Sequence, residues 1–382
     1  MKKTLGVLSF MLCATPMIYA QADGFATHDS SDVTMRLNGA AMGKVISSGS
    51  CGKNVNYELY DDYTLRIFGK GAMYNYNYIY TTKRMYSDTP WTSWDSKIKS
   101  VVIEEGVTRI GAYTFCFMES LTEVSIPNTV TSIGSSAFWW CTALEKIYIP
   151  NSVTSIGAYA FSECGSLAEV NIPDGLETIE GGVFVECSSL AHIDIPNSVT
   201  SIGRFAFSGT SLTEVIIPDG VTLIEECAFS HCDKLKYVKI GKGVTVMEDG
   251  AFFNDYTNRK IEIEIAAETH IALLDGKIWD YDGNKPSISE AFGFSYNPED
   301  ITIRVPETML DDYRNSEDWS YYNEHLYGYS STTPTGINSV DNGLSAKKAD
   351  VVYDLQGRRV TEMQPDRIYI VNGKKVVNKF RD

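Results

Sequence analysis

Hydrophobic positions return every 23 residues through the middle of this chain. Between residues 101 and 239 one apolar position appears in six copies, at intervals of 23, 23, 23, 22 and 23 residues. These copies are Val124, Ile147, Val170, Ile193, Val215 and Val238. A fixed period of this length is typical of a solenoid, in which each repeat forms one coil and buries its apolar face against the next coil. The pattern therefore predicts an elongated stack of coils.

Each repeat contains a short alternating segment that ends at a proline. Leu144, Ile147 and Ile149 have the spacing of a leucine-rich-repeat strand, in which alternate side chains enter the core. A proline cannot donate to a sheet ladder, so it marks the corner after the strand. The corner prolines are Pro127, Pro150, Pro173, Pro196 and Pro218. Val153 and Ile156 are then expected to turn inward from a second wall.

A bend and an aromatic core position complete the coil. Gly134, Gly157 and Gly203 follow the inward isoleucine, where a tight bend or a close backbone approach is expected. Glu180 and Glu225 take this place in other copies, so a positive φ is not required there. Phenylalanines are expected to fill the middle of successive coils, at Phe138, Phe161, Phe184, Phe207 and Phe229.

The repeating unit V-x-I-P-x-x-V-T-x-I-G-x-x-A-F-x-x-C-x-x-L resembles the BspA-like leucine-rich repeats of bacterial surface proteins, over residues 101–253. Flanking segments resemble the family's entry segment and closing coil; they are Ser48–Gly52, Leu65–Met73, Pro90 with Trp91, and Ile303–Pro306 with Tyr313 and Trp319. The resemblance implies secretion and surface display, with adhesion or ligand binding in some members, and it implies no catalytic residues.

The predicted fold is therefore a leucine-rich-repeat solenoid, a right-handed β/α superhelix that is mostly β with short helical turns. The expected parts are a signal peptide (1–22), an N-terminal β flank (23–98), the repeats (99–260), degenerate repeats with a C-terminal cap (261–329), a linker (330–350) and a small β module (351–382). The cap is expected to contain strands at Ile261–Ile265 and Ile301–Pro306, then a short helix from Met309 to Trp319 that shields the last coil.

Both ends of the chain carry signals related to export. Lys2 and Lys3 precede an apolar stretch and a small-residue cleavage site, with cleavage expected after Ala22 or alternatively after Ala20. The last residues predict two hairpins, one with Asn372-Gly373 at its turn, and resemble the C-terminal sorting domains of secreted proteins. Recognition by bacterial export machinery and a plain independent β module are equally compatible with them. The expected location is secreted or at the cell surface, in association with the outer membrane.

The composition and the motifs of the chain limit the classes of function that it can have. The formal net charge of −16 makes nucleic acid an unlikely partner. No apolar run after the leader reaches the roughly 20 residues that a membrane span needs. The five histidines lie in unrelated settings, and no nucleophile elbow, phosphate-binding loop or zinc-protease motif is present in the sequence. We therefore expect neither an enzyme nor a cofactor.

The cysteines are interpreted as buried thiols. Cys13 belongs to the leader, which leaves seven. Four of them follow the repeat phenylalanine by three residues: Cys141, Cys164, Cys187 and Cys232. Stacked coils keep equivalent Cβ atoms about 4.8 Å apart, wider than the ~3.8 Å of a disulfide. No zinc site is expected, because a second ligand type is missing. Cys51, Cys116 and Cys227 have no assignable partner.

The outward strand positions form a candidate binding strip. They are Glu123, Ser125, Lys146, Tyr148, Glu169, Asn171, His192, Asp194, Glu214, Ile216, Tyr237 and Lys239. Stacking predicts a strip with an acidic middle, which is either a solvated face or a groove for a polar ligand or peptide. Glu169, His192, Asp194 and Glu214 lie close enough in register for a divalent cation, but scattered carboxylates bind one only occasionally, so no metal site is assigned.

Aromatic residues define a second candidate surface. Trp139 and Trp140, with Phe117, occupy positions that are polar in most copies. Either the N-terminal flank covers this patch, through Trp91, Trp94 or the tyrosine run, or the patch is a partner site. The run consists of Tyr74, Tyr76, Tyr78 and Tyr80, and it places four rings on one face if extended.

Two functions follow. The favoured one is binding of a host or microbial surface protein through the strand face; the alternative is capture of a polysaccharide by the exposed aromatic residues. Sensitivity of binding to salt distinguishes them, because only the acidic strip depends on charge.

Overall fold

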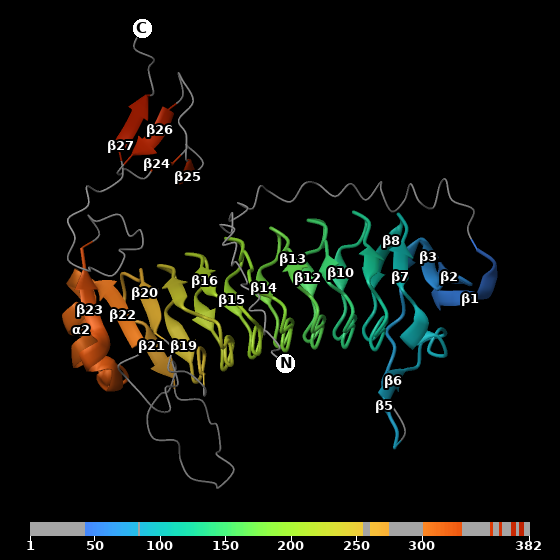
Figure 1. Ribbon diagram of the computed structural model, residues 1–382, viewed down its shortest axis with the longest axis horizontal. Helices are drawn as coiled ribbons and strands as arrows, with labels where there is room; N and C mark the ends of the chain where they lie inside the picture. The colour runs from blue at the N-terminus through green and yellow to red at the C-terminus, as the bar shows by residue number, and fades with distance from the viewer. Residues whose placement is uncertain are drawn as a thin grey trace, which may run out of the picture.

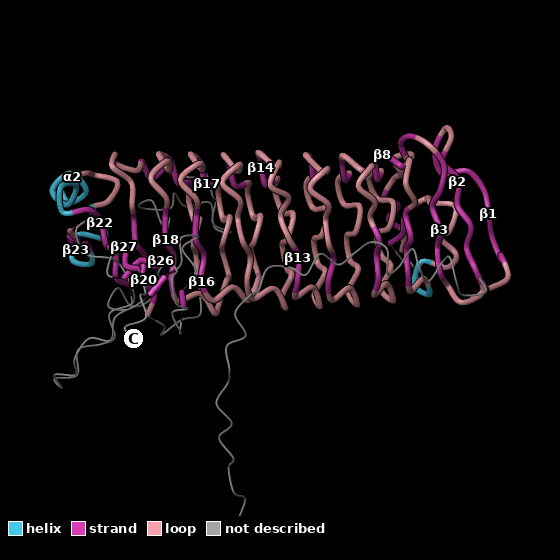
Figure 2. Tube along the Cα trace, turned by 90° about the horizontal axis from the view of Figure 1, so that it is seen from above, coloured by secondary structure: helices cyan, strands magenta, loops and turns pink. Residues whose placement is uncertain are grey.

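The repeats form one elongated stack of coils. The computed structural model describes residues 43–82, 85–254, 260–274 and 301–330, together with the backbone of four short strands between residues 352 and 377. The coils lie side by side along the long axis, with the N-terminal flank at one end and a helical cap at the other (Figure 1). Seen from above, each coil turns through short strands joined by tight corners (Figure 2). The predicted solenoid is confirmed.

One wall of the stack, which we call the strand face, is built from parallel strands that are one period apart. Val101 pairs with Val124, and Val215 pairs with Val238. The strands are β7 (Ser100–Ile103), β9 (Glu123–Ser125), β11 (Lys146–Ile147), β13 (Glu169–Val170), β16 (Glu214–Ile217), β18 (Tyr237–Ile240), β20 (Ile261–Ile265), β22 (Ile301–Pro306) and β23 (Leu326–Tyr329). This wall carries the predicted binding strip.

Several of these strands are shorter than the sequence pattern indicates. β11 ends at Ile147, three residues before its proline, because a side chain replaces the ladder at Ile149. Asn171 Oδ1 accepts a hydrogen bond from the Ile149 amide at 2.8 Å, and Asn171 Nδ2 donates to the Ile149 carbonyl at 2.7 Å. The next coil, between β13 and β16, contains no strand at residues 191–195. The strand face is therefore continuous as a surface but not as a hydrogen-bonded sheet.

The N-terminal flank extends the strand face and closes its first coil. β1 (Val45–Gly52), β2 (Val55–Tyr60) and β3 (Thr64–Gly69) are antiparallel, and β3 pairs in parallel with β7. Beyond β4 (Gly71–Ala72), the chain forms a hairpin of β5 (Tyr78–Tyr80) and β6 (Met85–Ser87) that projects from the stack (Figure 1). A 3-10 helix, η1 (Asp95–Lys97), leads into the repeats.

A second wall is formed by shorter parallel strands that follow the proline corner. One sheet contains β4, β8 (Val107–Ile110), β10 (Ser132–Ile133) and β12 (Ser155–Ile156). The other contains β14 (Thr178–Ile179), β15 (Ser201–Ile202), β17 (Leu223–Ile224), β19 (Val246–Glu248) and β21 (Ala272–Leu274). The two sheets are separate, so this wall is interrupted between β12 and β14.

A column of phenylalanine rings runs through the core. Neighbouring rings from Phe115 to Phe252 lie 5.1 to 5.7 Å apart between centroids, and all but the first pair are stacked. The residues two before and two after each phenylalanine from Phe115 to Phe229 have positive φ, as at Tyr159 and Glu163 around Phe161. Gly157 instead allows the backbone of the preceding coil to approach closely, since a Cβ on residue 157 would lie 2.5 Å from the Ser135 amide nitrogen. That expectation for the glycine is confirmed.

The seven described cysteines are all buried, and none of them forms a disulfide. In the predicted column, each thiol donates to the carbonyl of the phenylalanine in the preceding coil. The Sγ to O distances are 3.2 Å for Cys141, Cys164 and Cys187 and 3.4 Å for Cys232. The prediction of buried free thiols in a ladder is confirmed, because the side chains satisfy a core carbonyl rather than one another.

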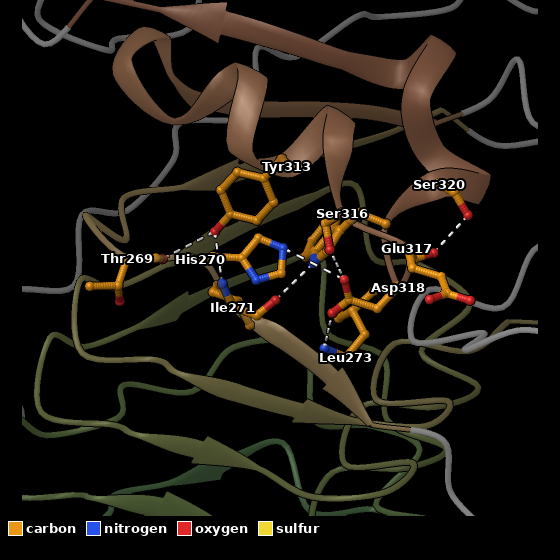
Figure 3. A network of polar contacts seen from close by, with 10 residues as sticks. Thr269, His270, Ile271, Leu273, Tyr313, Ser316, Glu317, Asp318 and Ser320 are labelled. Carbon is orange, nitrogen blue, oxygen red and sulfur yellow. Dashed lines mark hydrogen bonds and ion pairs between the residues drawn. The ribbon is translucent and has the colours of Figure 1, made fainter.

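The C-terminal cap packs a helical segment against the last coil. It consists of η3 (Glu307–Met309), α2 (Leu310–Asn315) and η4 (Ser320–His325). Trp319 Nε1 donates to the Ile271 carbonyl at 2.8 Å. The Leu273 amide donates to Asp318 Oδ2 at 2.9 Å (Figure 3). The predicted helix ends at Asn315 rather than at Trp319, because Ser316 is extended and its hydroxyl donates to Asp318.

The C-terminal module contains the predicted hairpins. β24 (Val352–Tyr353) pairs with β25 (Arg359–Val360), and β26 (Ile368–Val371) pairs with β27 (Lys374–Val377), all antiparallel. β24 also pairs with β26, which makes one four-stranded sheet. The expected signal peptide and most of the expected linker lie outside the described residues. Within the described residues, no helix is long and apolar enough to cross a bilayer.

Candidate functional site

The strand face presents its outward side chains in two rows. Register places Glu123, Lys146, Glu169, His192, Glu214, Tyr237 and Glu262 in the first row, and Ser125, Tyr148, Asn171, Asp194, Ile216, Lys239, Glu264 and Arg304 in the second. The side chains between the rows point into the core; Ile147, Val170 and Val215 are buried. Each row therefore repeats at the coil spacing of about 4.8 Å on a fixed backbone.

The middle of this strip is exposed and acidic, as predicted. Glu169, Asp194 and Glu214 are exposed, and so are Lys146 and Tyr148. His192 Nε2 lies 3.2 Å from Asp194 Oδ1, so these two neighbours on one coil form a surface pair. Glu169 and Glu214 form no ion pair within the described part of the chain. The centre of the strip consequently carries an excess of negative charge.

Five of the predicted strip residues are half-buried: Glu123, Ser125, Asn171, Tyr237 and Lys239. Asn171 is half-buried because its amide completes the ladder at Ile149. The hydroxyl of Tyr237 donates to Glu264 Oε2 at 3.1 Å. Burial, followed by the charge of Glu264, raises the pKa of the Tyr237 hydroxyl. Asn171 and Tyr237 thus hold the surface together rather than offering free polar groups.

The strip continues past the residues that the sequence pattern identified. Lys239 Nζ lies 3.0 Å from Glu264 Oε1, and Arg304 Nε lies 2.6 Å from Glu262 Oε1. Glu264 is buried, so its charge is compensated locally by Lys239 and Tyr237. The alternation in Ile261–Ile265 already contained this information, because the two glutamates fall on the outward positions of a predicted strand. The C-terminal half of the strip is therefore electrically balanced, whereas the middle is not.

The structure brings together no metal or catalytic constellation in the parts that it describes. No group of three or more His, Cys, Asp or Glu residues could hold a metal ion there. In the cap, His270 Nε2 lies 3.6 Å from Asp318 Oδ1, and the Ser316 hydroxyl donates to the same carboxylate (Figure 3). A nucleophilic serine would instead have to be bonded to the histidine. This network fastens the cap.

The aromatic patch is covered by the N-terminal flank. The ring of Tyr78, on β5, lies 5.3 Å from Trp139, 6.0 Å from Phe117 and 6.4 Å from Tyr113 between centroids. Trp139 is consequently half-buried; Trp140 is half-buried as well. The expectation that the flank folds over the patch is confirmed, and the tyrosine run supplies the covering residue.

The remaining flank aromatics divide between core and surface. Trp91 is fully buried, stacks on Phe115 at 6.0 Å and contacts Tyr76 at 5.9 Å. Tyr74 and Tyr80 are exposed. The four tyrosines do not form one row on a common face, because the chain is a strand only from Tyr78 onward and the rings of Tyr76 and Tyr78 pack at different places.

Comparison with known families agrees with this architecture. Residues 93–210 and 154–269 match the BspA type leucine-rich repeat region, with six copies. The repeat region of this chain belongs to the BspA-type leucine-rich repeats. A scaffold of this kind generally binds partners rather than catalysing reactions.

Solved structures with related folds were also found. A leucine-rich cell surface protein from Faecalibacterium prausnitzii is 26% identical, with 61% of this chain and 73% of that chain covered and a TM-score of 0.41. A leucine-rich repeat protein from Eubacterium ventriosum is 22% identical, with 60% and 68% covered and a TM-score of 0.36. One from Bacteroides ovatus is 20% identical, with 60% and 79% covered and a TM-score of 0.33. The comparison with curated proteins found no match.

Proposed function

We propose that this protein is a cell-surface binding protein that engages a host or microbial surface protein through the middle of the strand face. The observation that carries this proposal is the pair of registered rows, in which Glu169, Asp194 and Glu214 lie exposed on neighbouring coils. Glu169 and Glu214 form no ion pair within the described residues, and Asp194 pairs only with His192. Charge at this position attracts a cationic partner over several ångströms before contact is made.

The backbone supports the proposal by holding these side chains in place. Each exposed residue is flanked by buried neighbours, such as Val170 beside Glu169 and Val215 beside Glu214. A rigid arrangement reduces the conformational entropy that binding would otherwise cost. The face therefore suits recognition of a partner with a matching spacing of basic groups.

Apolar groups at the same surface favour a protein over a small ion. Ile216 is 56% exposed and Tyr148 is 41% exposed, and both lie in the second row on either side of Asp194. Aromatic side chains are enriched at interface centres, where tyrosine contributes apolar area and a hydrogen bond. A partner that presents basic and apolar side chains together fits this surface.

Location belongs to the same proposal. Residues 1–22 direct export, and the C-terminal module is read by bacterial export or sorting machinery, which leaves the solenoid at the outer membrane surface. The experiment is fractionation of cells that express the chain with and without residues 351–382. Retention of the full chain at the surface and release of the shortened chain into the medium is the expected result.

A polysaccharide is the second candidate ligand at the N-terminal end, because Tyr74 and Tyr80 are 50% and 73% exposed. Rings of this kind stack on sugar faces. Binding there would be insensitive to salt, whereas binding through the acidic strip weakens as salt screens the charges.

The test is binding of the full mature chain to arrays of extracellular-matrix proteins and of polysaccharides, at low and high salt. Glu169→Lys combined with Asp194→Lys should reduce protein binding about tenfold or more, since like charges then face the basic partner. The matched control is Glu105→Lys with Glu119→Lys, which makes the same change in charge at exposed residues outside the strip. Equal loss in both double variants, or binding that salt does not weaken, would argue against the strand face.

A further inference from the structure

The interruption of the second wall leaves backbone groups without partners. At each neighbouring junction, two amides donate to carbonyls of the preceding coil. Between β10 and β12, Thr154 donates to Thr131 at 3.0 Å and Gly157 donates to Ile133 at 2.9 Å. Between β14 and β15, Thr200 donates to Glu177 and Gly203 donates to Ile179, both at 2.8 Å. At the junction between β12 and β14 neither bond forms. The amides of Glu177 and Glu180, and the carbonyls of Thr154 and Ile156, make no hydrogen bond within the described chain.

A groove lies at this junction. It has a volume of about 410 Å³, and its walls include Thr154, Ser155, Glu177, Thr178 and Glu180. Hydroxyls, carboxylates and the unpaired backbone groups therefore face one space. Thr154, Ser155, Glu177 and Glu180 are exposed, so water reaches these donors and acceptors, and a polar ligand that displaces the water can bond to the same groups.

A missing side chain contributes to the opening. Ser152 and Ser198 each donate a hydroxyl hydrogen bond to a carbonyl of the preceding coil, at 2.7 and 2.8 Å, and Thr129 does the same at 2.8 Å. Gly175 takes this place in the coil of β14 and has no hydroxyl. Gly220 occupies the equivalent place at a closed junction, so the lost bond is one contribution and not the whole cause.

An aromatic ring spans the same junction. Tyr159 follows β12 by three residues, and Gly182 follows β14 by three residues. The ring lies against Gly182, where a Cβ would be 2.3 Å from Tyr159 Cε1, so a larger residue at position 182 would displace the ring. The side chain is nevertheless 47% exposed. One face of the ring is thus held by the second coil while much of it remains open to solvent.

We propose that this groove binds a neutral saccharide, at a site separate from the strand face. A sugar hydroxyl both donates and accepts, so it can satisfy the amides of Glu177 and Glu180 and also bond to the carbonyls and carboxylates opposite. A lysine or arginine side chain only donates and would leave both amides unpaired. An acidic sugar would be repelled by the two carboxylates. Tyr159 is not itself a lining residue, but it follows the lining residue Ile156 by three positions, and its exposed ring supplies the stacking surface for the apolar face of a sugar ring.

The experiment is titration of the full mature chain with neutral gluco-, manno- and xylo-oligosaccharides, followed by NMR or calorimetry, with a galacturonate oligomer as the acidic probe. Dissociation constants on the order of 1 mM are expected, as for a small polar ligand with few contacts. Two variants target the groove. Tyr159→Ser copies Ser136, which has the same positive φ in the preceding coil. Gly175→Ser copies Ser152 and Ser198.

Both variants should lower the affinity for the neutral oligosaccharide about tenfold, Tyr159→Ser by loss of stacking and Gly175→Ser by filling the groove. Tyr148→Ser, which removes an exposed tyrosine from the strand face, is the control and should leave the affinity unchanged. Circular dichroism establishes whether each variant is folded. If Tyr159→Ser does not fold, Gly175→Ser still tests the proposal. Failure of every neutral oligosaccharide to bind, equal effects of the control, or preference for galacturonate or a basic peptide would overturn the proposal.

Discussion

The thiol of Cys141 donates a hydrogen bond to the carbonyl of Phe115 in the preceding coil, with 3.2 Å between Sγ and the oxygen. The same relationship joins Cys164 to Phe138 and Cys187 to Phe161. These cysteines recur in a way that suggests a disulfide framework, but their thiols instead donate hydrogen bonds to backbone carbonyls in the core. Two predictions about the cysteines follow from it.

Thiol reagents should not label the native protein at pH 8. Burial raises the pKa of the Cys51, Cys116 and Cys232 thiols to about 12 and that of Cys227 to about 11, so the reactive thiolate is scarce. In the mature chain, from which Cys13 has been removed with the leader, a chromogenic disulfide reagent should find seven thiols in denaturant and none within minutes under native conditions. Cys227, at 8% exposure, should react first as denaturant is added. Rapid native labelling of several thiols would contradict the buried ladder.

Stability should fall as the solution becomes alkaline. The folded state raises the thiol pKa of Cys232 from 9.0 to about 12, so the folded form retains a proton that the unfolded form releases. The stabilisation is complete below pH 9 and is lost between pH 9 and about 12, by up to ~1.4 kcal/mol per pH unit for each such thiol. Urea midpoints between pH 8 and 11 measure this effect.

The control for that measurement is Cys232→Ala. It should be less stable at pH 8, because it lacks the buried side chain, but its urea midpoint should decline less steeply with pH. Parallel decline in both proteins would assign the alkaline loss to other groups.

Replacing one strained residue by glycine should stabilise the protein. Glu186 has φ of 59°, and Gly209 occupies the equivalent place in the next coil with φ of 73°. A left-handed conformation costs a residue with a Cβ about 1 kcal/mol, which Glu186→Gly would recover, less the entropy that glycine gains when unfolded. The net gain should be about 0.5 kcal/mol in urea unfolding. Glu145→Gly, at an exposed residue without positive φ, should instead lower the stability by a similar amount.

The two halves of the strand face should respond differently to loss of a cation. Lys239→Met removes the partner of buried Glu264 and should destabilise the fold by about 2 kcal/mol, because the carboxylate stays desolvated. His192→Ala removes the partner of Asp194, which is 84% exposed as a side chain, and should change stability by less than about 0.5 kcal/mol. Thermal unfolding of both variants is the measurement. Equal losses of stability in the two variants would show that the buried carboxylate of Glu264 does not depend on Lys239 for compensation of its charge.

Some features could be read from single residues because the repeat makes local and global structure agree. Ile147 and Val170 recur at the coil period, so their burial follows from the register alone. The phenylalanine column, the cysteine ladder and the outward positions of Glu169 and Glu214 followed for the same reason. The alternation in Ile261–Ile265 predicts the cap strand, but the sequence pattern alone does not show that its two glutamates extend the strip.

Other features depended on contacts between residues that no period relates. Tyr78 covers Trp139 across 61 positions of sequence, and the alternation of the tyrosine run gave no indication of which ring would do so. Asn171 closes the ladder at Ile149 instead of facing a ligand, since an amide can replace backbone bonds only when the next coil brings it within reach.

Periodicity in the sequence thus determined the coils, their core and the side that each residue faces, because identical repeats bury identical positions. The tertiary structure decided which of the outward groups are free. Glu264 is compensated by Lys239 while Glu169 has no ion-pair partner in the described chain, and the amides of Glu177 and Glu180 open onto a groove although their equivalents elsewhere are bonded. Small differences in the stacking of adjacent coils set these outcomes, and such differences arise from non-local packing that a repeat pattern does not encode.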